Sequence, residues 1–534
     1  MASITNETND RRIAAQIQEI RDKCTRSTYL DVFASDNAIE IYPRIPGEPS
    51  ASHRNPINVR RSEMQYEETM TAIGEILAQN YAQLDSFSLS ELDSPDNSYP
   101  QFWRGLAANR VLTNVDFDDD VFPNEPEAAL FLSNPALESV YMNSCTFSDG
   151  AFGSFCQGIR SSHIKKLYVV LSDLPPDESW SLLWSALEHG AKHLERLDFY
   201  FSDNTLRGAE NGFESFLANN TTIQSLRMGG DGIGRDQLPF FGALGRGLAV
   251  NTAAKILELA FWREYDDQGF TKQLIRTVFE AGLDQNMAVN SLIFKMKVNP
   301  ETVNDLHDGL ERMMRNRTNA VTHSGHDQEE SLPVLERLEI GRKCRGYPED
   351  DFTIAVARAQ FFDRLSRSDV IRVENVVFHF PKIELLLPFN VYDFIRSTQV
   401  TKSLVLSGYH PRLEDTHLVD LADAMEANNS ISELEIDGVQ FHKVINLLET
   451  PNAYRIRCQC RRNEIQVQSL RRDENLSLLP FVLSRLLSSD ERPTDENERR
   501  EIEARQLVDR TVAFEILREI PALFAVYGNQ NGEE

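Results

Sequence analysis

A short pattern of hydrophobic and polar residues recurs along the chain. In "LESVYMNSCTF" (137–147), counted in steps of one residue from Leu137, hydrophobic residues occupy steps 1, 4 and 6. Tyr141, which carries a polar hydroxyl group, separates steps 4 and 6. The same spacing returns in "LERLDFYFSDN" (194–204), "IQSLRMGGDGI" (223–233) and "ISELEIDGVQF" (431–441). Alternation with a period of two predicts a short strand that buries one face. The sequence therefore predicts one kind of strand, used many times.

Twelve such phrases can be aligned on their first step. The steps between successive starts are 28, 25, 27, 30, 29, 31, 35, 46, 38, 28 and 30 residues. A nearly constant period in this range predicts a stack of repeats, each of which covers the core of its neighbours. The starts are Leu84, Leu112, Leu137, Ile164, Leu194, Ile223, Ala254, Val289, Leu335, Val373, Thr401 and Ile431.

A helical segment lies between successive strand phrases. Its hydrophobic residues recur at helical spacing in "AIGEILAQN" (72–80), "ENGFESFLANN" (210–220), "FFGALGRGLAVN" (240–251) and "LADAMEANN" (421–429). Six of these segments close on an asparagine that follows a hydrophobic residue by three positions. Asparagine tolerates the left-handed conformation that ends many helices, so we expect C-caps in that conformation at Asn80, Asn109, Asn220, Asn251, Asn286 and Asn428.

The repeated phrase and the intervening helices resemble the leucine-rich repeat family, of the ribonuclease-inhibitor type, over about residues 65–450. Cys145 stands at step 9, where that family places Asn or Cys. The nearest resemblance is to cytoplasmic leucine-rich repeat proteins of single-celled algae. It implies an α/β solenoid, shaped as one horseshoe, with a parallel inner sheet, outer helices and a helical C-terminal cap.

The segments outside the repeats predict caps. Residues 1–64 form an N-terminal cap segment, with a helix over 10–30 and a strand at "NAIEIYP" (37–43). Residues 65–450 hold the repeats, and 451–534 a last edge strand at "AYRIRCQC" (453–460) and a helical cap. Amphipathic helices at 475–488 and 496–524 would cover the end of the stack, or form a separate partner-binding domain. The polar segment 315–333, inside the longest step, predicts a mobile loop.

The composition of the chain limits which kinds of partner and which cellular compartment we expect. The 534 residues carry a formal charge of −27, which disfavours nucleic acid and anionic membranes and suits a basic or mixed-charge protein partner. No stretch approaches the length of an apolar membrane span, and the first residues lack a signal-peptide core. Six scattered cysteines form no disulfide framework, so we expect a reduced, cytoplasmic protein.

Several short clusters could suggest chemistry, but each has a simpler structural interpretation as a turn, a solvated loop or strand residues. The sequence shows no recognised catalytic motif, so we expect no enzyme, no cofactor and no metal site. The clusters are His323, His326 and Asp327; Glu188, His189 and His193; the glycine-rich "GGDGIG" (229–234); Asp118, Asp119 and Asp120; and Cys458 with Cys460.

The strand positions between the buried steps carry the candidate binding residues. Steps 3, 5 and 7 should point away from the core, and tyrosine and arginine gather there on adjacent repeats. Both residue types are enriched at protein-binding hot spots, although exposed strands also favour aromatic residues for packing between strands. The candidates are Asp116, Asp118, Tyr141, Tyr168, Arg196, Asp198, Tyr200, Arg227 and Glu258.

These expectations favour a non-catalytic scaffold that binds a protein on the concave face of the sheet. A regulator of a small GTPase is the alternative, because one branch of this repeat type resembles the activators of the Ran GTPase. Such a regulator steers the chemistry of its GTPase and needs no active site of its own.

Overall fold

The structure is a computed structural model of the whole chain. It describes residues 15, 18–19, 22, 29–35, 38–44, 57–60, 63–80, 84–90, 99–123, 126–148, 150–171, 178–201, 210–231, 235–263, 270–296, 300–323, 332–341, 351–379, 389–407, 415–436, 439–440, 451–464, 502 and 506–514. The chain divides into two compact units, an N-terminal unit of Met1–Val289 and a C-terminal unit of Asn290–Glu534.

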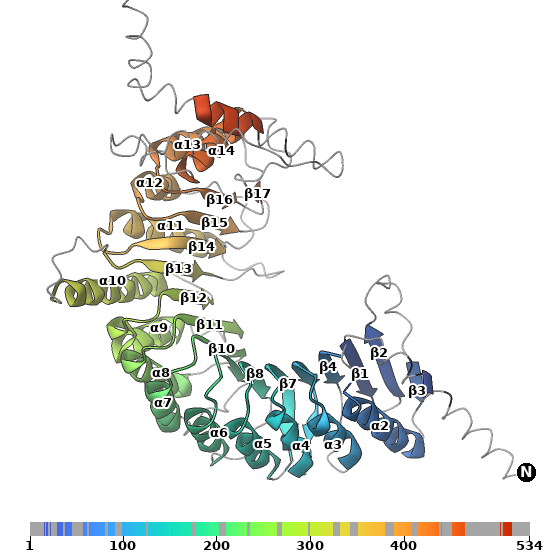
Figure 1. The fold of residues 1–534 in the computed structure, drawn as a ribbon. Coiled ribbons are helices and arrows are strands. Elements are labelled where there is room, and N and C mark those ends of the chain that lie inside the picture. The colour runs from blue at the N-terminus through green and yellow to red at the C-terminus, as the bar shows by residue number, and fades with distance from the viewer. Residues whose placement is uncertain are drawn as a thin grey trace, which may run out of the picture. The chain divides into compact units, whose positions relative to one another are not determined.

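The N-terminal unit is built on a parallel sheet (Figure 1). Its parallel strands follow one another in the order β1, β4, β5, β7, β8, β9, β10 and β11. Two further strands continue the sheet beyond β1: β2 pairs antiparallel with β1, and β3 pairs antiparallel with β2. The short β6 pairs with β7. The bounds are β1 Tyr29–Ser35, β2 Ala38–Arg44, β3 Ile57–Arg60, β4 Ser86–Ser90, β5 Asn114–Asp118, β6 Val121–Phe122, β7 Ser139–Phe147, β8 Lys166–Leu171, β9 Arg196–Phe201, β10 Ser225–Asp231 and β11 Ile256–Arg263.

One helix or short helical pair follows most of these strands, and all of them lie on the same side of the sheet in this unit (Figure 1). Buried aromatic residues such as Phe102, Trp184 and Phe241 fill the layer between helices and strands. The bounds are α2 Glu63–Ala78, α3 Pro100–Ala108, α4 Pro126–Leu130, η2 Phe131–Ser133, α5 Ala151–Arg160, α6 Glu178–His189, α7 Glu210–Asn219, η3 Arg235–Gln237, α8 Leu238–Val250, α9 Phe270–Ala281 and η4 Leu283–Gln285.

The C-terminal unit repeats the same design. Strands β12 to β16 are parallel in sequence order, and the short β17 closes on β16 antiparallel. The bounds are β12 Ser291–Lys295, α10 Pro300–His323, β13 Leu335–Ile340, α11 Asp351–Arg367, β14 Val373–His379, α12 Phe389–Ser397, β15 Ser403–Ser407, α13 Asp415–Ala427, β16 Glu433–Ile436, β17 Val439–Gln440 and α14 Pro451–Glu464.

The fold is therefore a repeat solenoid of the α/β class, with a parallel sheet and helices on one side of it. All twelve predicted strand phrases lie on strands, and the first step of each is at most 3% exposed. The register also holds where the repeats are irregular, since Ser291 pairs with Arg337 and Arg337 with Asn375, each at step 3 of its phrase. That all the repeats form one horseshoe stays a prediction.

The asparagines end the helices by a different mechanism from the expected one. Asn109, Asn251 and Asn286 have φ near −62°, −71° and −69° and extended ψ, and among the six only Asn80 is left-handed, with φ 53°. The expected left-handed C-cap is thus confirmed at Asn80 and wrong at the other five positions. At Asn109, Asn251 and Asn286 the side chains act instead, because the amide group reaches both the following turn and the preceding repeat.

Asn251 shows this bonding in full. Its Oδ1 accepts hydrogen bonds from the backbone N–H groups of Ala253 (3.0 Å) and Ala254 (2.8 Å). Its Nδ2 donates to the carbonyl oxygens of Leu217 (2.7 Å) and Asn220 (2.8 Å) in the preceding repeat. The buried side chains of Asn109, Asn286 and Asn428 make equivalent bonds. We call this series the asparagine ladder.

Cys145 satisfies backbone in the same way at the other end of a strand. It is fully buried, and its thiol lies 3.5 Å from the carbonyl oxygen of Phe117 in the preceding repeat and 3.4 Å from that of Asn143. Burial also raises the pKa of this thiol, so the sulfur stays protonated and can donate. A cysteine at step 9 of this phrase therefore serves to satisfy backbone carbonyl groups.

The N-terminal cap contains two strands more than expected, β1 and β3. Residues 38–44 form β2, which confirms the strand predicted at 37–43, but β1 at Tyr29–Ser35 precedes it and overlaps the end of the helix predicted over 10–30. Residues 15, 18, 19 and 22 are helical, and the rest of 10–28 lies outside the described residues. Leu30 and Val32 are buried, so β1 supplies the first rung of the parallel core.

The predicted edge strand at 453–460 is wrong, because this segment is part of helix α14. Ala453, Ile456 and Cys460 are buried and fall at helical spacing, which competes with the alternating pattern seen in the sequence. Helix α14 takes the place of a further repeat. Its Asn463 donates to the carbonyl oxygen of Ile431 (2.7 Å), as the asparagine ladder does elsewhere.

A C-terminal helical segment packs on α14, as a cap should. Residues 506–514 are helical, with Val508 and Val512 buried. Arg461 of α14 pairs with Asp509 at 2.7 Å, and the hydroxyl groups of Tyr454 and Thr511 lie 2.6 Å apart. The predicted helix at 475–488 lies outside the described residues.

The polar insertion is only in part what the sequence predicted. Residues 315–323 belong to helix α10, so the expected loop is wrong there, and residues 324–331 lie outside the described part of the chain. Arg317 is 6% exposed, and Arg315 pairs with Glu311 one turn earlier. Ion pairs of this kind and burial of one long side chain can extend a helix without a hydrophobic stripe.

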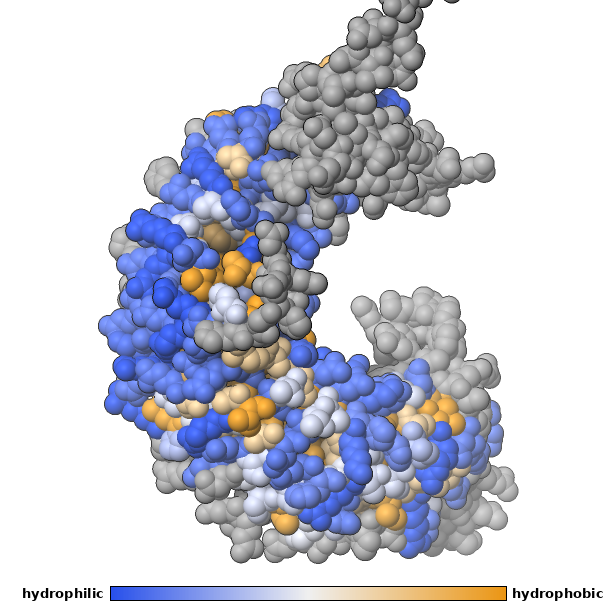
Figure 2. Space-filling view, turned by 60° about the vertical axis from the view of Figure 1, so that its left-hand side comes forward, coloured by the Kyte–Doolittle hydropathy of each residue, from blue (hydrophilic) through white to orange (hydrophobic). Residues whose placement is uncertain are grey.

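Figure 2 shows that hydrophilic residues cover most of the surface on the side it displays, with smaller hydrophobic areas between them. Hydrophobic side chains such as Val250 of α8 and Met287, which follows η4, are exposed at single positions. Among the described residues, no helix is both long enough and apolar enough to cross a membrane.

Candidate protein-binding face

Three tyrosines form a ladder on adjacent strands of the N-terminal unit. Tyr141 on β7 pairs in register with Tyr168 on β8, and their rings stack with centroids 3.8 Å apart and planes 10° apart. The ring of Tyr200 on β9 follows at 5.2 Å from that of Tyr168. A hydrogen bond also joins the phenol groups of Tyr141 and Tyr168. We call these three residues the tyrosine ladder.

The tyrosine ladder lies on the open face, by which we mean the face of the sheet opposite the helices. Along β7 the even steps, Val140 and Met142, are fully buried against the helices, whereas Tyr141 is half-buried on the other side. Tyr168 is half-buried in the same way between the buried Leu167 and Val169. Parts of both rings are therefore accessible to a partner.

Tyr200 has a supporting position rather than an exposed one, since it is only 7% exposed. Its ring lies across Gly229 of β10, where an added Cβ would meet Tyr200 Cε1 at 2.7 Å and the carbonyl oxygen of Ala260 at 2.1 Å. Glycine is thus required at 229 for the ring to lie flat on the sheet. In this position the ring of Tyr200 supports that of Tyr168, to which it is tilted by 37°.

The candidate arginines are held by carboxylates on the same face. Arg196 binds Asp198 with Nε 2.9 Å and 3.0 Å from the two carboxylate oxygens and with Nη2 at 2.5 Å from Oδ2. Arg227 lies between Asp198 and Glu258, with Nε 3.8 Å and 3.2 Å from their nearest oxygens. Charge pairing of this kind lowers the cost of removing the two carboxylates from water.

The structure differs from the sequence-based expectation in the exposure of these carboxylates. Asp198 is 4% and Glu258 is 2% exposed, whereas the side chains of Arg196 and Arg227 keep 37% and 30% of their surface. The two acidic groups therefore position the guanidinium groups, and the arginines face the solvent. Truncation of Asp198 or Glu258 should consequently lower the stability of the fold, whereas truncation of an exposed residue would leave it nearly unchanged.

The end of the tyrosine ladder that lies next to β5 is acidic. Asp116 pairs in register with Tyr141, and Asn143 donates to Asp118 at 2.5 Å. Burial is the main cause that raises the pKa of Tyr141, and the charges of Asp116 and Asp118 raise it further. Burial and two carboxylates raise the pKa of Tyr200 to about 12. The phenols are thus neutral near pH 7, and they can donate hydrogen bonds beside negative charge.

All nine candidates thus lie on one face, over β5 to β11, as the sequence predicted. Among the nine candidates, four carboxylates and two guanidinium groups give an excess of negative charge. The accessible members are Asp116, Asp118, Tyr141, Tyr168, Arg196 and Arg227, and the buried ones are Asp198, Tyr200 and Glu258.

A second polar cluster, in the C-terminal unit, was not found from the sequence. His379 on β14 lies between Glu339 on β13, with Nε2 3.0 Å from Oε1, and Ser407 on β15, with Nδ1 2.5 Å from Oγ. Arg337 holds the other carboxylate oxygen of Glu339 at 2.5 Å. Burial opposes ionisation of Glu339, but the hydrogen bonds from His379 and Arg337 outweigh it and lower its pKa to about 2.

The signal for this cluster was present in the repeat register. Glu339 stands at step 5 of its phrase, and His379 and Ser407 stand at step 7 of the next two phrases, all on the open face. The residues are 40 and 28 positions apart in the chain, so a search for short motifs cannot connect them. A comparison of the same steps across repeats could have done so.

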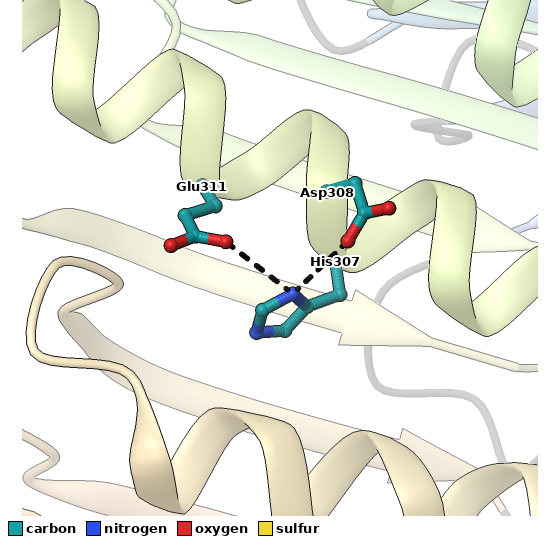
Figure 3. Close-up of side chains that lie close together, drawn as sticks. All are labelled: His307, Asp308 and Glu311. Carbon is teal, nitrogen blue, oxygen red and sulfur yellow. Dashed lines mark ion pairs between the residues drawn. The ribbon is translucent and has the colours of Figure 1, made fainter.

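A third cluster lies on the helical side of the C-terminal unit (Figure 3). His307 Nδ1 is 3.6 Å from Asp308 Oδ1 and 4.0 Å from Glu311 Oε2, which is close enough for a shared metal ion. However, Arg364 of α11 donates to Asp308 at 2.8 Å, and its Nη1 lies 3.5 Å from His307 Nδ1. Its positive charge already balances the carboxylate, so we interpret the cluster as a contact between helices α10 and α11.

The other short clusters of the sequence have structural roles where they are described. Glu188 accepts hydrogen bonds from Ser215 (3.2 Å) and Asn219 (2.7 Å) of the next helix. Cys458 and Cys460 are buried in α14, Gly229 and Gly230 belong to β10, and Asp118 ends β5. His326 and Asp327 lie outside the described residues.

Comparison with known proteins adds no family to this picture. A scan against protein-family models gives no match for the chain, and a search of curated proteins finds no relative.

Proposed function

We propose that the chain is a scaffold whose N-terminal unit binds another protein on its open face, and that this face is non-catalytic. The observation that carries this proposal is the tyrosine ladder. Tyr141 and Tyr168 present stacked, neutral rings that are only half-buried, beside two partly exposed guanidinium groups. Tyrosine and arginine dominate the energetics of protein interfaces because they combine a large contact area with a polar group.

The partner is a protein segment that carries positive charge. Asp116 and Asp118 flank the exposed edge of the ladder, and tyrosine faces attract cations. A lysine or arginine of the partner can therefore lie over Tyr141 and contact the aspartates, while its acidic residues pair with Arg196 or Arg227. Complementarity of this kind makes the association sensitive to salt.

The repeat phrase, the asparagine ladder and the parallel sheet support membership of the leucine-rich repeat family, of the ribonuclease-inhibitor type. The sparse, unpaired cysteines among the described residues suit a reducing compartment, and we infer a cytoplasmic location.

The experiment is affinity capture from native lysate with three forms of the full chain. The parent is compared with Tyr168→Ala and with Val405→Ala, which removes a half-buried side chain at the same step of a repeat in the C-terminal unit. We expect a protein that the parent and Val405→Ala retain and Tyr168→Ala loses. Identical captured proteins for all three forms would contradict the proposal, provided that all three melt at similar temperatures.

A further inference from the structure

The cluster of Glu339, His379 and Ser407 has an arrangement that the scaffold proposal does not use. Three adjacent strands each supply one side chain, so the parallel register fixes their spacing, and Ser407 pairs directly with His379 in the ladder of β14 and β15. The side chains of His379 and Glu339 are 17% and 7% exposed, and Ser407 is 8% exposed. The cluster is thus shielded, and part of the His379 side chain remains exposed to solvent.

The position of Glu339 determines which nitrogen of His379 carries the proton. An ionised carboxylate can only accept a hydrogen bond, so the Nε2 atom that faces it must carry hydrogen. In the neutral ring, Nδ1 then has a free lone pair, and Ser407 can bond to it only by donating its hydroxyl proton. A nucleophilic serine donates its hydroxyl proton to a general base in the same direction, from Oγ to an unprotonated imidazole nitrogen.

Arg337 makes the arrangement rigid. It binds the second oxygen of Glu339, so the first oxygen stays directed at His379. A base that is oriented by a third group is the general form of an activated serine. The simpler reading is that these polar groups only satisfy one another on a crowded sheet face, and the two readings differ in the reactivity of Ser407.

We propose that Ser407 is a nucleophilic serine that accepts an acyl group from small carboxylic esters. Ser407 Oγ forms a bond to the carbonyl carbon, the ester C–O bond breaks, and the serine proton passes through His379 Nδ1 to the departing alcohol. His379 is the base and Glu339 is the positioning residue, so no oxidant or metal is needed. This inference concerns the C-terminal unit and stands independently of the binding face.

The test is acetylation of the full chain by p-nitrophenyl acetate, followed by peptide mapping. We expect an acetyl group on Ser407 of the folded chain, and none there after unfolding in urea. Ser403 is the matched internal control, because it lies on the same strand and face at step 3, away from the imidazole. It should stay unmodified over the same period.

Two variants connect the reactivity to the cluster. Ser407→Ala should remove the modification, and His379→Gln, which keeps a polar side chain of similar length, should slow it by roughly 100-fold. Acetylation of Ser403 as fast as Ser407, equal labelling of the unfolded chain, or an unchanged rate in a His379→Gln chain that melts like the parent would each overturn the proposal. The first two comparisons need no variant, so they hold even if His379→Gln fails to fold.

Discussion

Asn251 gives the sharpest test of how the repeats are held together. The side chain is 4% exposed and makes four hydrogen bonds, two to the turn that follows it and two to the preceding repeat. Asn251→Ala removes all four bonds and leaves two carbonyl and two N–H groups without a partner where water has little access. A hydrogen bond contributes about 1 kcal/mol net, and more when its partner stays buried, so the free energy of unfolding should fall by about 4 kcal/mol.

The assay is equilibrium unfolding in urea followed by far-UV circular dichroism. The matched control is Asn219→Ala, which removes an exposed asparagine that bonds only to side chains, Glu188 and Ser215, and should change stability by about 0.5 kcal/mol or less. Because repeat proteins can unfold in parts, hydrogen exchange at residues 251–257 gives a local measurement as well. Equal unfolding midpoints for the two variants, together with hydrogen exchange like that of the parent, would refute the structural role of the asparagine ladder.

Three further predictions concern charge, packing and the α10 extension. The pKa of Glu339 is lowered to about 2 in the folded chain, so its ionised form stabilises the fold by about 3 kcal/mol at neutral pH. This stabilisation is present above the ordinary pKa near 4.5 and is lost as the pH falls from there toward 2. Acid titrations of the folded chain should show this loss in the parent and in the control Glu336→Gln, but not in Glu339→Gln. Gly229→Ala should lower stability by about 1–3 kcal/mol and weaken partner binding, because the new methyl group displaces the ring of Tyr200, and parent-like melting and binding would argue against this packing. Replacing 315–323 with glycine and serine should lower the melting temperature by more than a few degrees, since it removes a buried arginine side chain and two turns of helix. An unchanged melting curve would instead support the mobile loop that the sequence predicted.

The strands could be predicted from the sequence because their burial is local and periodic. Hydrophobic residues at steps 1, 4 and 6 recur in twelve phrases, and this spacing determines both where a strand lies and which face it buries. The predicted register between neighbouring strands is therefore correct even where the repeat length varies. The candidate face followed directly, since residues two steps apart on a strand must share a face. Tyr141, Tyr168 and Tyr200 were placed together for this reason.

The errors came from interactions between repeats, which no single segment contains. Asparagine at a helix end suggested a left-handed cap, but the side-chain amides of the asparagine ladder donate to carbonyl groups 30 to 38 residues earlier in the chain. The burial of Glu258, and in part that of Asp198, depends on Arg227 of the strand between them. At 453–460 the residues satisfy both the strand and the helix pattern, and packing against α13 favours the helix.

The most direct test of the binding face is the affinity of a captured partner for Tyr168→Ala. Titration calorimetry should show a loss of about 2 kcal/mol or more, which corresponds to roughly 30-fold in Kd, and an affinity that falls further as salt is added. Val405→Ala should bind like the parent, and both variants should melt near the parent temperature. If Tyr168→Ala also binds like the parent, the tyrosine ladder is not the contact site, and the proposed binding face is wrong.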